Sequence, residues 1–493
     1  MFYPKFEKIS ELAKDYNLIP IAMDIFADTE TPVSIFKKIK DISPYCFLLD
    51  SVEGGEKWAR YSFIGTSPLM RIKIKGNIAT ITNRDGSVKT IEGNPYKTIQ
   101  DIMQSFKGAK VEGIERFTGG AVGYFGYDLV RSVEFLPNVP KDDLDMPDCH
   151  FMIADEVIAF DHLKQKITLI VNMPTNDDLN YLYENTKERL LKLSHIIKSK
   201  DHNIKPSNTN KNSPLDLSAM SNMSKEYYCK MVQKAKEYII NGDIFQVVLS
   251  RRFCLPCDLD SFDVYRLLRV SNPSPYMYYL KFDDTCIAGA SPEMLVRCEN
   301  GIVETCPIAG TRKRGANEQE DNALEKELLA DEKELSEHTM LVDLGRNDIG
   351  KVSKFSSVKV TEYMKVVKYS HVMHIVSLVS GKLRDDLNAF DALMALLPAG
   401  TLSGAPKIRA MEIIDELEPT KRGIYGGAIG YISFNGNLDS CITIRTILFK
   451  NGLAYIQAGA GIVADSVPEK EFEESENKAM ASIKAITGAD KLN

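Results

Sequence analysis

Two pairs of glutamates have the spacing that brings carboxylates together on one face of a helix. Glu334 and Glu337 are three residues apart, as are Glu471 and Glu474, and side chains three apart in a helix are neighbours. Carboxylate oxygens from two such helices suit Mg²⁺, which keeps several water ligands and takes others from an anionic substrate. Both segments are also rich in Glu and Lys, as solvated helix faces are. Spacing alone therefore leaves a metal site and a charged surface as alternatives.

Two further segments have the composition of anion-binding loops. Cys306–Arg312 contains a Pro and a Gly-Thr pair, and we expect a turn there that presents backbone N–H groups to an anion, or else an ordinary turn. Leu397–Lys407 is rich in glycine and precedes an amphipathic run, Ile408–Leu417. A helix N-terminus at that point would favour a carboxylate or a phosphate. The loop lacks the spacing of a P-loop, so it does not indicate nucleotide binding.

Three other features are compatible with a ligand site. We expect Asp439–Thr446 to form an apolar strand, in which Arg445 needs a partner, either a substrate carboxylate or an internal Asp or Glu. Gln457–Ile462 is a strand end of small residues that lets a ligand approach the backbone. His374 lies in an apolar run, where a histidine is more often a core residue than a catalyst.

Composition argues against nucleic-acid and membrane partners. The 493 residues carry a net charge of −7 with both signs interspersed, so we expect no basic face. No apolar run is as long as a membrane span, and Met1–Ser10 lacks a signal-peptide core, so we expect a cytoplasmic protein. The nine cysteines do not suggest a disulfide framework, and the CxxC of Cys254 and Cys257 is expected to be two ordinary thiols.

One polar segment, Lys198–Pro214, separates two parts of globular composition. We therefore expect an N-terminal part over 1–195, a linker or surface loop over 196–215 and a C-terminal part over 216–493. Periodicity and capping residues predict the following elements. They are a hairpin at Ile72–Thr82, strands at Ile167–Val171 and Val247–Phe253, and helices at Leu179–Lys198, Ser224–Asn241, Asn322–Leu344 and Ser466–Ile486.

A short internal similarity links the two parts. Gly119–Phe125 and Gly426–Ile432 are identical at five of seven positions. Glycines in a strand mark a close approach of neighbouring backbone, so both parts are expected to use a similar sheet element. Seven residues are weak evidence for duplication, since such strands recur by chance.

In combination, about ten of these motifs occur in the order found in the chorismate-utilising enzymes, which the chain resembles over roughly 222–485. The N-terminal part resembles component I of the anthranilate synthases at Leu48–Ser51 and Trp58–Gly65. This resemblance implies an α+β fold with face-packed antiparallel β-sheets and helices outside. The motifs that carry it are Gln246–Ser250, Ser291–Met294, Pro307–Thr311, Glu334/Glu337, Met340–Asp348, His374, Gly400–Lys407, Tyr425, Arg445, Gly459–Gly461 and Glu471/Glu474.

The resemblance also implies roles for these residues. Mg²⁺ would be bound by Glu337 and Glu474, with Glu334 and Glu471 directly or through water. Glu293 would be the general acid for the departing ring hydroxyl, and His374 would serve the elimination of pyruvate. The carboxylates and the enolpyruvyl group of chorismate would be bound by Gly310, Thr311, Thr401, Tyr425, Arg445, Gly459, Ala460 and Gly461, and Lys478 would neutralise the acidic cluster.

Two positions distinguish the activities of this family. Relatives that add water to chorismate carry a lysine base where this chain has Gln246, and a neutral amide is no base. Aminodeoxychorismate synthases carry a nucleophilic lysine where this chain has Ala309. The combination implies ammonia as the nucleophile and anthranilate as the product. The alternatives are an aminodeoxyisochorismate synthase and a catalytically silent chorismate- or tryptophan-binding subunit.

The resemblance further implies a partner and an inhibitor. No cysteine lies in a G-x-C-x-G context, so a separate glutamine amidotransferase subunit would supply the ammonia. Tryptophan, as a feedback inhibitor, would bind at Ser51, Asn272, Pro275, Tyr276, Met277, Ile429 and Tyr431. Asp50 replaces the usual glutamate beside Ser51, which puts the support of this inhibitor site in doubt.

Overall fold

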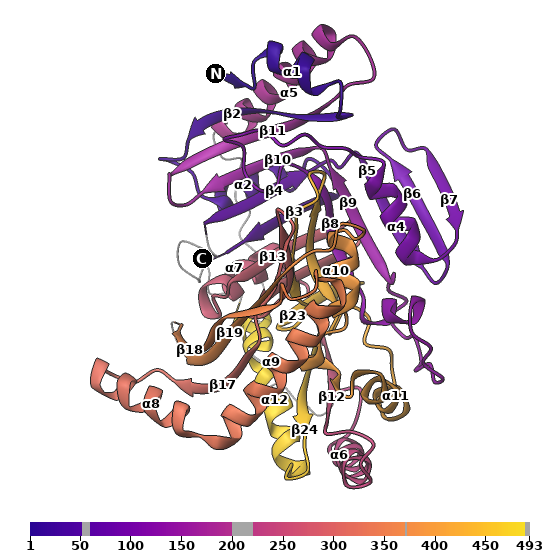
Figure 1. Ribbon diagram of the computed structural model, residues 1–493, viewed down its shortest axis with the longest axis vertical. Coiled ribbons are helices and arrows are strands. Elements are labelled where there is room, and N and C mark those ends of the chain that lie inside the picture. Colours follow the sequence, from indigo (N-terminus) through magenta and orange to yellow (C-terminus); the bar gives the residue numbers. More distant parts are fainter. Residues whose placement is uncertain (52–59, 200–219, 370–371, 489–493) are drawn as a thin grey trace.

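The protein is built on two large antiparallel sheets, each of which contains strands from both halves of the chain (Figure 1). The computed structural model describes residues 1–51, 60–199, 220–369 and 372–488. Elements of the first half lie at the top of Figure 1 in indigo and violet, and those of the second half lie below in orange and yellow. Most of the expected linker, residues 200–215, lies outside the described residues, and the division at 195 and 216 stays a prediction.

The first sheet has twelve strands. In order across the sheet they are β1 (Phe2–Tyr3), β2 (Leu18–Phe26), β11 (Lys166–Pro174), β10 (Glu156–Asp161), β4 (Tyr61–Thr66), β3 (Tyr45–Asp50), β13 (Tyr276–Phe282), β14 (Thr285–Ser291), β23 (Thr446–Lys450), β24 (Leu453–Ile462), β12 (Gln246–Pro256) and β20 (Gly404–Ala405). The halves of the chain meet where β3 pairs with β13.

The second sheet also has twelve strands, of which β18 (Lys359–Lys368) pairs only with β19. The others are, in order, β17 (Ile308–Lys313), β19 (Val372–Lys382), β16 (Ile302–Thr305), β15 (Met294–Glu299), β22 (Leu438–Ile442), β21 (Ala428–Ser433), β8 (Gly120–Phe125), β9 (Cys149–Ala154), β5 (Met70–Lys75), β6 (Ile78–Asn83) and β7 (Val88–Glu92). Here the halves meet where β8 pairs with β21.

Eleven α-helices accompany these sheets in the described residues. They are α1 (Phe6–Leu12), α2 (Pro32–Ile39), α4 (Pro95–Gln104), α5 (Leu179–Lys198), α6 (Lys225–Ile240), α7 (Ser261–Ser271), α8 (Glu318–Ala330), α9 (Glu332–Val352), α10 (Ala389–Leu396), α11 (Lys407–Leu417) and α12 (Pro468–Gly488). Not one of them, over the part of the chain described, combines the length and the apolar character of a bilayer span.

The sheets pack face to face, because successive residues of a strand point to opposite faces. In β13, Tyr278 belongs to a core shared with the second sheet, whereas Tyr279 belongs to a core shared with helices. Helices α1, α2, α5, α7 and α12 cover the outer face of the first sheet. Helices α4, α9 and α10 cover that of the second. The expected α+β fold, with face-packed antiparallel sheets and outer helices, is confirmed.

Several predicted elements are confirmed as well. The hairpin is β5–β6, and the predicted strands are β11 and β12. Ser224 caps α6, since its side chain accepts a hydrogen bond from the N–H of Tyr227. The similar glycine segments are neighbouring strands, with Gly123 opposite Gly430. A Cβ at Gly123 would lie 2.0 Å from the carbonyl oxygen of His150 on β9, so the sheet requires glycine there.

Three predicted elements are wrong in detail. The helix expected at Asn322–Leu344 is two helices, because Asp331 ends α8 and its carboxylate caps α9. The strand expected at Asp439–Thr446 is β22 and β23 with a break between them, where Arg445 has a left-handed φ of 52°. The turn expected at Cys306–Arg312 is largely strand β17, with a bulge at Gly310, whose φ is 64°.

Candidate active site

The acidic helices α9 and α12 bring their glutamates close enough to interact. Partial burial raises the pKa of Glu337, and the charges of Glu334 on the same helix and of Glu474 on α12 raise it further. Burial and the charge of Glu474 likewise raise the pKa of Glu471. The four carboxylates are therefore close enough for their charges to interact, and like charges this close favour a bound cation.

These carboxylates are not yet arranged around a metal position. Among the residues described, no three Asp, Glu, His or Cys side chains form a ready metal-binding group. Two of the glutamates are engaged by cations instead: Glu474 Oε1 lies 2.6 Å from Lys478 Nζ, and Glu334 Oε1 lies 3.4 Å from Arg312 Nη1. The donor set, which is all carboxylate oxygen, fits a hard cation such as Mg²⁺, and ligation would require the glutamates to leave these partners.

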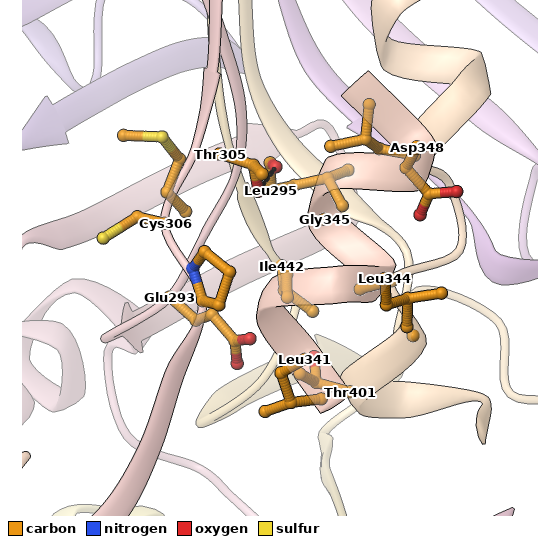
Figure 2. A pocket seen from close by; sticks show the side chains of 15 residues that line it. Glu293, Leu295, Thr305, Cys306, Leu341, Leu344, Gly345, Asp348, Thr401 and Ile442 are labelled. Carbon is orange, nitrogen blue, oxygen red and sulfur yellow. Dashed lines mark hydrogen bonds between the residues drawn. The ribbon is translucent and has the colours of Figure 1, made fainter. Parts of the chain in front are cut away.

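Glu293 is a buried carboxyl that lines a pocket between the sheets and α9. It follows β14 and faces α9 across a pocket that Thr401 and Leu341 also line (Figure 2). Burial raises the pKa of its carboxyl to about 7, and this rise is partly offset by the nearby Thr401 hydroxyl and by the charge of Lys478. The Thr401 hydroxyl is itself buried without a regular hydrogen-bond partner. Glu293 is thus protonated in a large fraction of molecules at neutral pH and can give up a proton.

His374 has one ring nitrogen bonded to the backbone of the neighbouring strand. It lies on β19 opposite Thr311 of β17, and its Nδ1 is 3.0 Å from the Gly310 carbonyl oxygen. Because a carbonyl oxygen only accepts hydrogen bonds, this contact assigns the proton to Nδ1 and leaves Nε2 as the basic nitrogen. Burial lowers the pKa of His374, the hydrogen bond to Gly310 partly offsets this, and the charge of Arg445 lowers the pKa further. A description of His374 as only a core residue is therefore incomplete.

Arg445 has no internal carboxylate partner within the described residues. Its Nη1 donates to the backbone carbonyl of Lys478 at 2.8 Å, and no ion pair is formed by its guanidinium there. Burial lowers its pKa, which is the mark of a cation held without full compensation. Of the two partners that the sequence left open, an internal Asp or Glu in direct contact is not found among the described residues.

Gln246 and the glycine strand lie against each other. Gln246 begins β12, which pairs with β24 through its next residue and Ile462. A Cβ at Gly461 would lie 2.6 Å from Gln246 Nε2, so the present position of the amide depends on glycine there. Lys478 Nζ donates to the carbonyl oxygen of Gly459 at 3.1 Å. The predicted substrate residues of β12, β24 and α12 are therefore in one region, and Ala460 between them is fully buried.

Two residues that position the acidic helices were not predicted from the sequence. Arg251 of β12 donates to Ser475 Oγ at 2.9 Å and to Glu476 Oε2 at 3.0 Å, which attaches α12 to the first sheet. His338 of α9 is completely buried, and its Nε2 lies 2.6 Å from Ser377 Oγ on β19. The sequence signal for both residues was a charged or polar side chain in an otherwise apolar pattern, because a buried polar group needs a partner.

A second pocket contains six of the seven residues expected to bind an inhibitor. Ser51 Oγ donates to the carbonyl oxygen of Pro275 at 2.6 Å. Asp50 accepts from Arg269 Nε at 2.8 Å and from the hydroxyl of Ser62, so the shorter side chain is well held. Asn272 is not a lining residue and instead ends α7. The expected residues that line the pocket are Ser51, Pro275, Tyr276, Met277, Ile429 and Tyr431.

Comparisons with known proteins agree with this architecture. The family model of the chorismate binding enzymes matches residues 43–484. The chain is 60% identical to anthranilate synthase component 1 of Acetivibrio thermocellus, with all of both chains covered, and 47% identical to that of Aquifex aeolicus (strain VF5), with 98% of each covered. The crystal structure of anthranilate synthase component I from Streptococcus pneumoniae TIGR4 matches with a TM-score of 0.73 at 41% identity, over 88% of this chain and 95% of that one.

A more distant structure shares the fold. The menaquinone-specific isochorismate synthase of Escherichia coli matches with a TM-score of 0.69 at 18% identity, over 98% of both chains.

Proposed function

Since the chain belongs to the anthranilate synthase component 1 family of chorismate binding enzymes, it is an enzyme that acts on chorismate, and we propose that it converts chorismate and ammonia to anthranilate, pyruvate and water with Mg²⁺. One observation carries the choice of reaction. The site offers the amide of Gln246 and the methyl group of Ala309, where relatives with other activities have lysines. Neither side chain can activate water or attack the ring, so the nucleophile is ammonia.

Chorismate is a dianion, and the chain provides its counter-charges locally. Arg445 binds one carboxylate, with the Tyr425 hydroxyl and the backbone at Gly310 and Gly459 around it. Glu337 and Glu474, with Glu334 and Glu471 nearby, would hold Mg²⁺, and the cation would supply positive charge beside the ring carboxylate. An acidic protein thereby binds an anionic substrate.

Amination needs an acid at the departing hydroxyl. Ammonia forms a bond to the ring carbon next to the one that carries the carboxylate, the ring double bonds shift, and the C–O bond of the ring hydroxyl breaks. Glu293 donates its proton to that oxygen, so that water leaves rather than hydroxide. The carboxyl pKa of about 7 supports this role, because the protonated form is available near neutral pH.

Aromatisation needs a base at the aminated carbon. Nε2 of His374 accepts the proton from that carbon, the electron pair enters the ring, and the bond between the ring and the enolpyruvyl oxygen breaks. The released enol becomes pyruvate, and the ring becomes anthranilate. The proton on Nδ1, which faces Gly310, leaves Nε2 free for this step.

The ammonia source is proposed to be a separate glutamine amidotransferase subunit. A glutaminase uses a reactive cysteine thiolate. All nine cysteines lie in the described residues, and burial raises the pKa of Cys46, Cys149, Cys229, Cys254, Cys257, Cys298, Cys306 and Cys441, which makes these thiols poor nucleophiles. The name component 1, carried by the relatives, also supports a second component.

The isolated chain should therefore form anthranilate from chorismate, Mg²⁺ and ammonium chloride, and should form none when glutamine replaces the ammonium salt. The fluorescence of anthranilate measures the product, since an aminated ring that has kept its enolpyruvyl group is not aromatic. Addition of the amidotransferase subunit is the positive control for glutamine. Glutamine-dependent turnover by the pure chain would contradict the two-subunit proposal, and absence of anthranilate with ammonium would contradict the proposed reaction.

Feedback inhibition by tryptophan is proposed for the pocket around Ser51. The pocket combines apolar walls with the carboxylate of Asp439, which receives hydrogen bonds from Tyr276 and Arg297. Ser51→Phe should fill the pocket and raise the tryptophan concentration for half-inhibition by at least about tenfold, because a bound ligand and a phenyl ring cannot share the space. Turnover without tryptophan should change little, and Ser51→Ala is the matched control. Unaltered inhibition of Ser51→Phe would place the inhibitor elsewhere.

A further inference from the structure

A buried ion pair lies behind the proposed chorismate site, just beyond the end of α11. Arg422 Nη2 is 2.6 Å from Glu418 Oε1, and Arg422 Nε donates to Glu418 Oε2 at 2.9 Å. The exposed fractions of the two side chains are 2% and 3%. A pair so completely removed from water is costly unless its remaining donors and acceptors are satisfied, so its other contacts show what it holds together.

The other contacts of Arg422 reach two backbone segments. Nη1 donates to the carbonyl oxygen of Leu402 at 2.7 Å, and Nη2 donates to that of Val248 at 2.7 Å. Its guanidinium also lies 5.6 Å from the centre of the Tyr425 ring, within cation–π range. One side chain thus touches the loop that carries Thr401, the strand that begins at Gln246, and Tyr425 itself.

The carboxylate of Glu418 accepts its other hydrogen bonds in the same region. Its Oε1 accepts hydrogen bonds from the N–H of Ser250 at 2.8 Å and from the hydroxyl of Ser250 at 2.9 Å. The Ser250 oxygen in turn accepts from Gln457 Nε2 at 2.8 Å, on β24 two residues before Gly459. The network therefore extends to the glycine strand.

We propose that Glu418 and Arg422 are positioning residues that hold the Thr401 loop, the Gln246 strand, the glycine strand and Tyr425 in the mutual arrangement needed to bind chorismate. The inference rests on the proposed function, because it concerns how that site is kept in place. The pair itself touches no reacting atom in this assignment. It acts through four segments that are far apart in the chain, and it adds side-chain bonds to the strand pairing that already joins β12 to β24.

Arginine is required at this point by geometry. Its planar guanidinium directs N–H groups to the carboxylate and to two carbonyl oxygens at once. A lysine keeps the positive charge opposite Glu418 but presents its three donors from one atom, so it cannot reach Leu402 and Val248 together. Arg422→Lys therefore removes the arrangement while it keeps the charge balance of the buried pair.

We expect Arg422→Lys to raise the KM for chorismate about tenfold and to lower kcat by a smaller factor, since small displacements of binding groups have large effects on reaction geometry. The assay uses the full chain with chorismate, Mg²⁺ and saturating ammonium chloride, well below the unfolding temperature. Half-inhibition by tryptophan should stay unchanged, because the Ser51 pocket is outside the network. A purely structural role would lower the unfolding temperature and leave KM unaltered.

Arg189→Lys is the matched control. Arg189 of α5 also bridges two carboxylates, with Nη2 at 2.6 Å from Asp155 and 2.5 Å from Glu156, and no predicted substrate residue is among its partners. Ser250→Ala is the second variant. It removes the hydroxyl that joins Glu418 to Gln457 on β24, keeps the hydrogen bond from the Ser250 N–H to Glu418, and carries little risk to folding. It should raise KM about threefold, as the loss of a single bonded group would.

The outcomes distinguish a failure of the proposed function from a failure of the positioning role. If the unaltered chain forms no anthranilate, the proposed function fails. If it does, and KM for chorismate rises in Arg422→Lys and Ser250→Ala but not in Arg189→Lys, the positioning role is supported. If Arg422→Lys does not fold, the KM of Ser250→Ala decides. Unchanged KM in the folded variants, or an equal rise in Arg189→Lys, would overturn the inference.

Discussion

Glu293→Gln should lower kcat for anthranilate formation by about 10²- to 10⁴-fold, which is the usual contribution of a positioned general acid. Glutamine keeps the shape of the side chain but has no proton to transfer to the departing hydroxyl. The measurement is kcat with saturating chorismate, Mg²⁺ and ammonium. Glu304→Gln, on β16 of the second sheet, is the matched control and should retain full activity. A kcat for Glu293→Gln within about threefold of the unaltered chain would rule out acid catalysis by Glu293.

The pH dependence gives an independent check of this role. The pKa of Glu293 is raised to about 7, so the protonated acid predominates below pH 7 and kcat should fall as the pH rises through this value. Stability should follow the same direction. A carboxyl whose pKa is raised by folding binds more protons in the folded state, so its contribution to stability is lost as the pH rises toward 7. Glu293→Gln should therefore be at least as stable as the unaltered chain above pH 7 while it is far less active, which separates loss of chemistry from loss of fold.

Glu337→Gln should raise the Mg²⁺ concentration for half-maximal turnover by at least about 10²-fold, because even partners outside the ligand shell cost up to that much when they are removed. Direct binding provides a readout besides activity. Mg²⁺ should raise the unfolding temperature of the unaltered chain, since a ligand that binds only the folded state stabilises it, and this shift should be small in the variant.

Without Mg²⁺, the unfolding temperature of Glu337→Gln should be no lower than that of the unaltered chain. Glu337 lies close to the like charges of Glu334 and Glu474, so the neutral amide relieves repulsion and should unfold no earlier than the glutamate. Glu332→Gln, at the exposed start of α9, is the matched control and should respond to Mg²⁺ like the unaltered chain. An equal Mg²⁺ response in Glu337→Gln would exclude this carboxylate as a ligand.

Local signals in the sequence were sufficient for many of the elements. Ser224 predicted the start of α6 because its hydroxyl satisfies a helix N–H that has no partner in the helix. Alternation predicted the β5–β6 hairpin. The long acidic helix failed at Asp331, because acid-rich helical periodicity continues through a residue that both ends α8 and caps α9. Arg445 was misplaced for a similar reason: apolar neighbours predict a strand, whereas its left-handed backbone depends on how β22 and β23 leave their two different sheets.

The sequence by itself determined which chemical groups are available. Four carboxylates at helical spacing, an amide at Gln246 and a methyl group at Ala309 are facts of residue type, and the proposals for the metal and the nucleophile rest on them. Only the tertiary structure decided which side chains are protonated and which distant residues come into contact. The raised pKa of Glu293 comes from burial, the basic Nε2 of His374 from the Gly310 carbonyl, and the Glu418–Arg422 network from segments that converge at the end of α11. The physical reason is that burial and strand pairing join residues distant in the chain, and no local pattern states which residues those are.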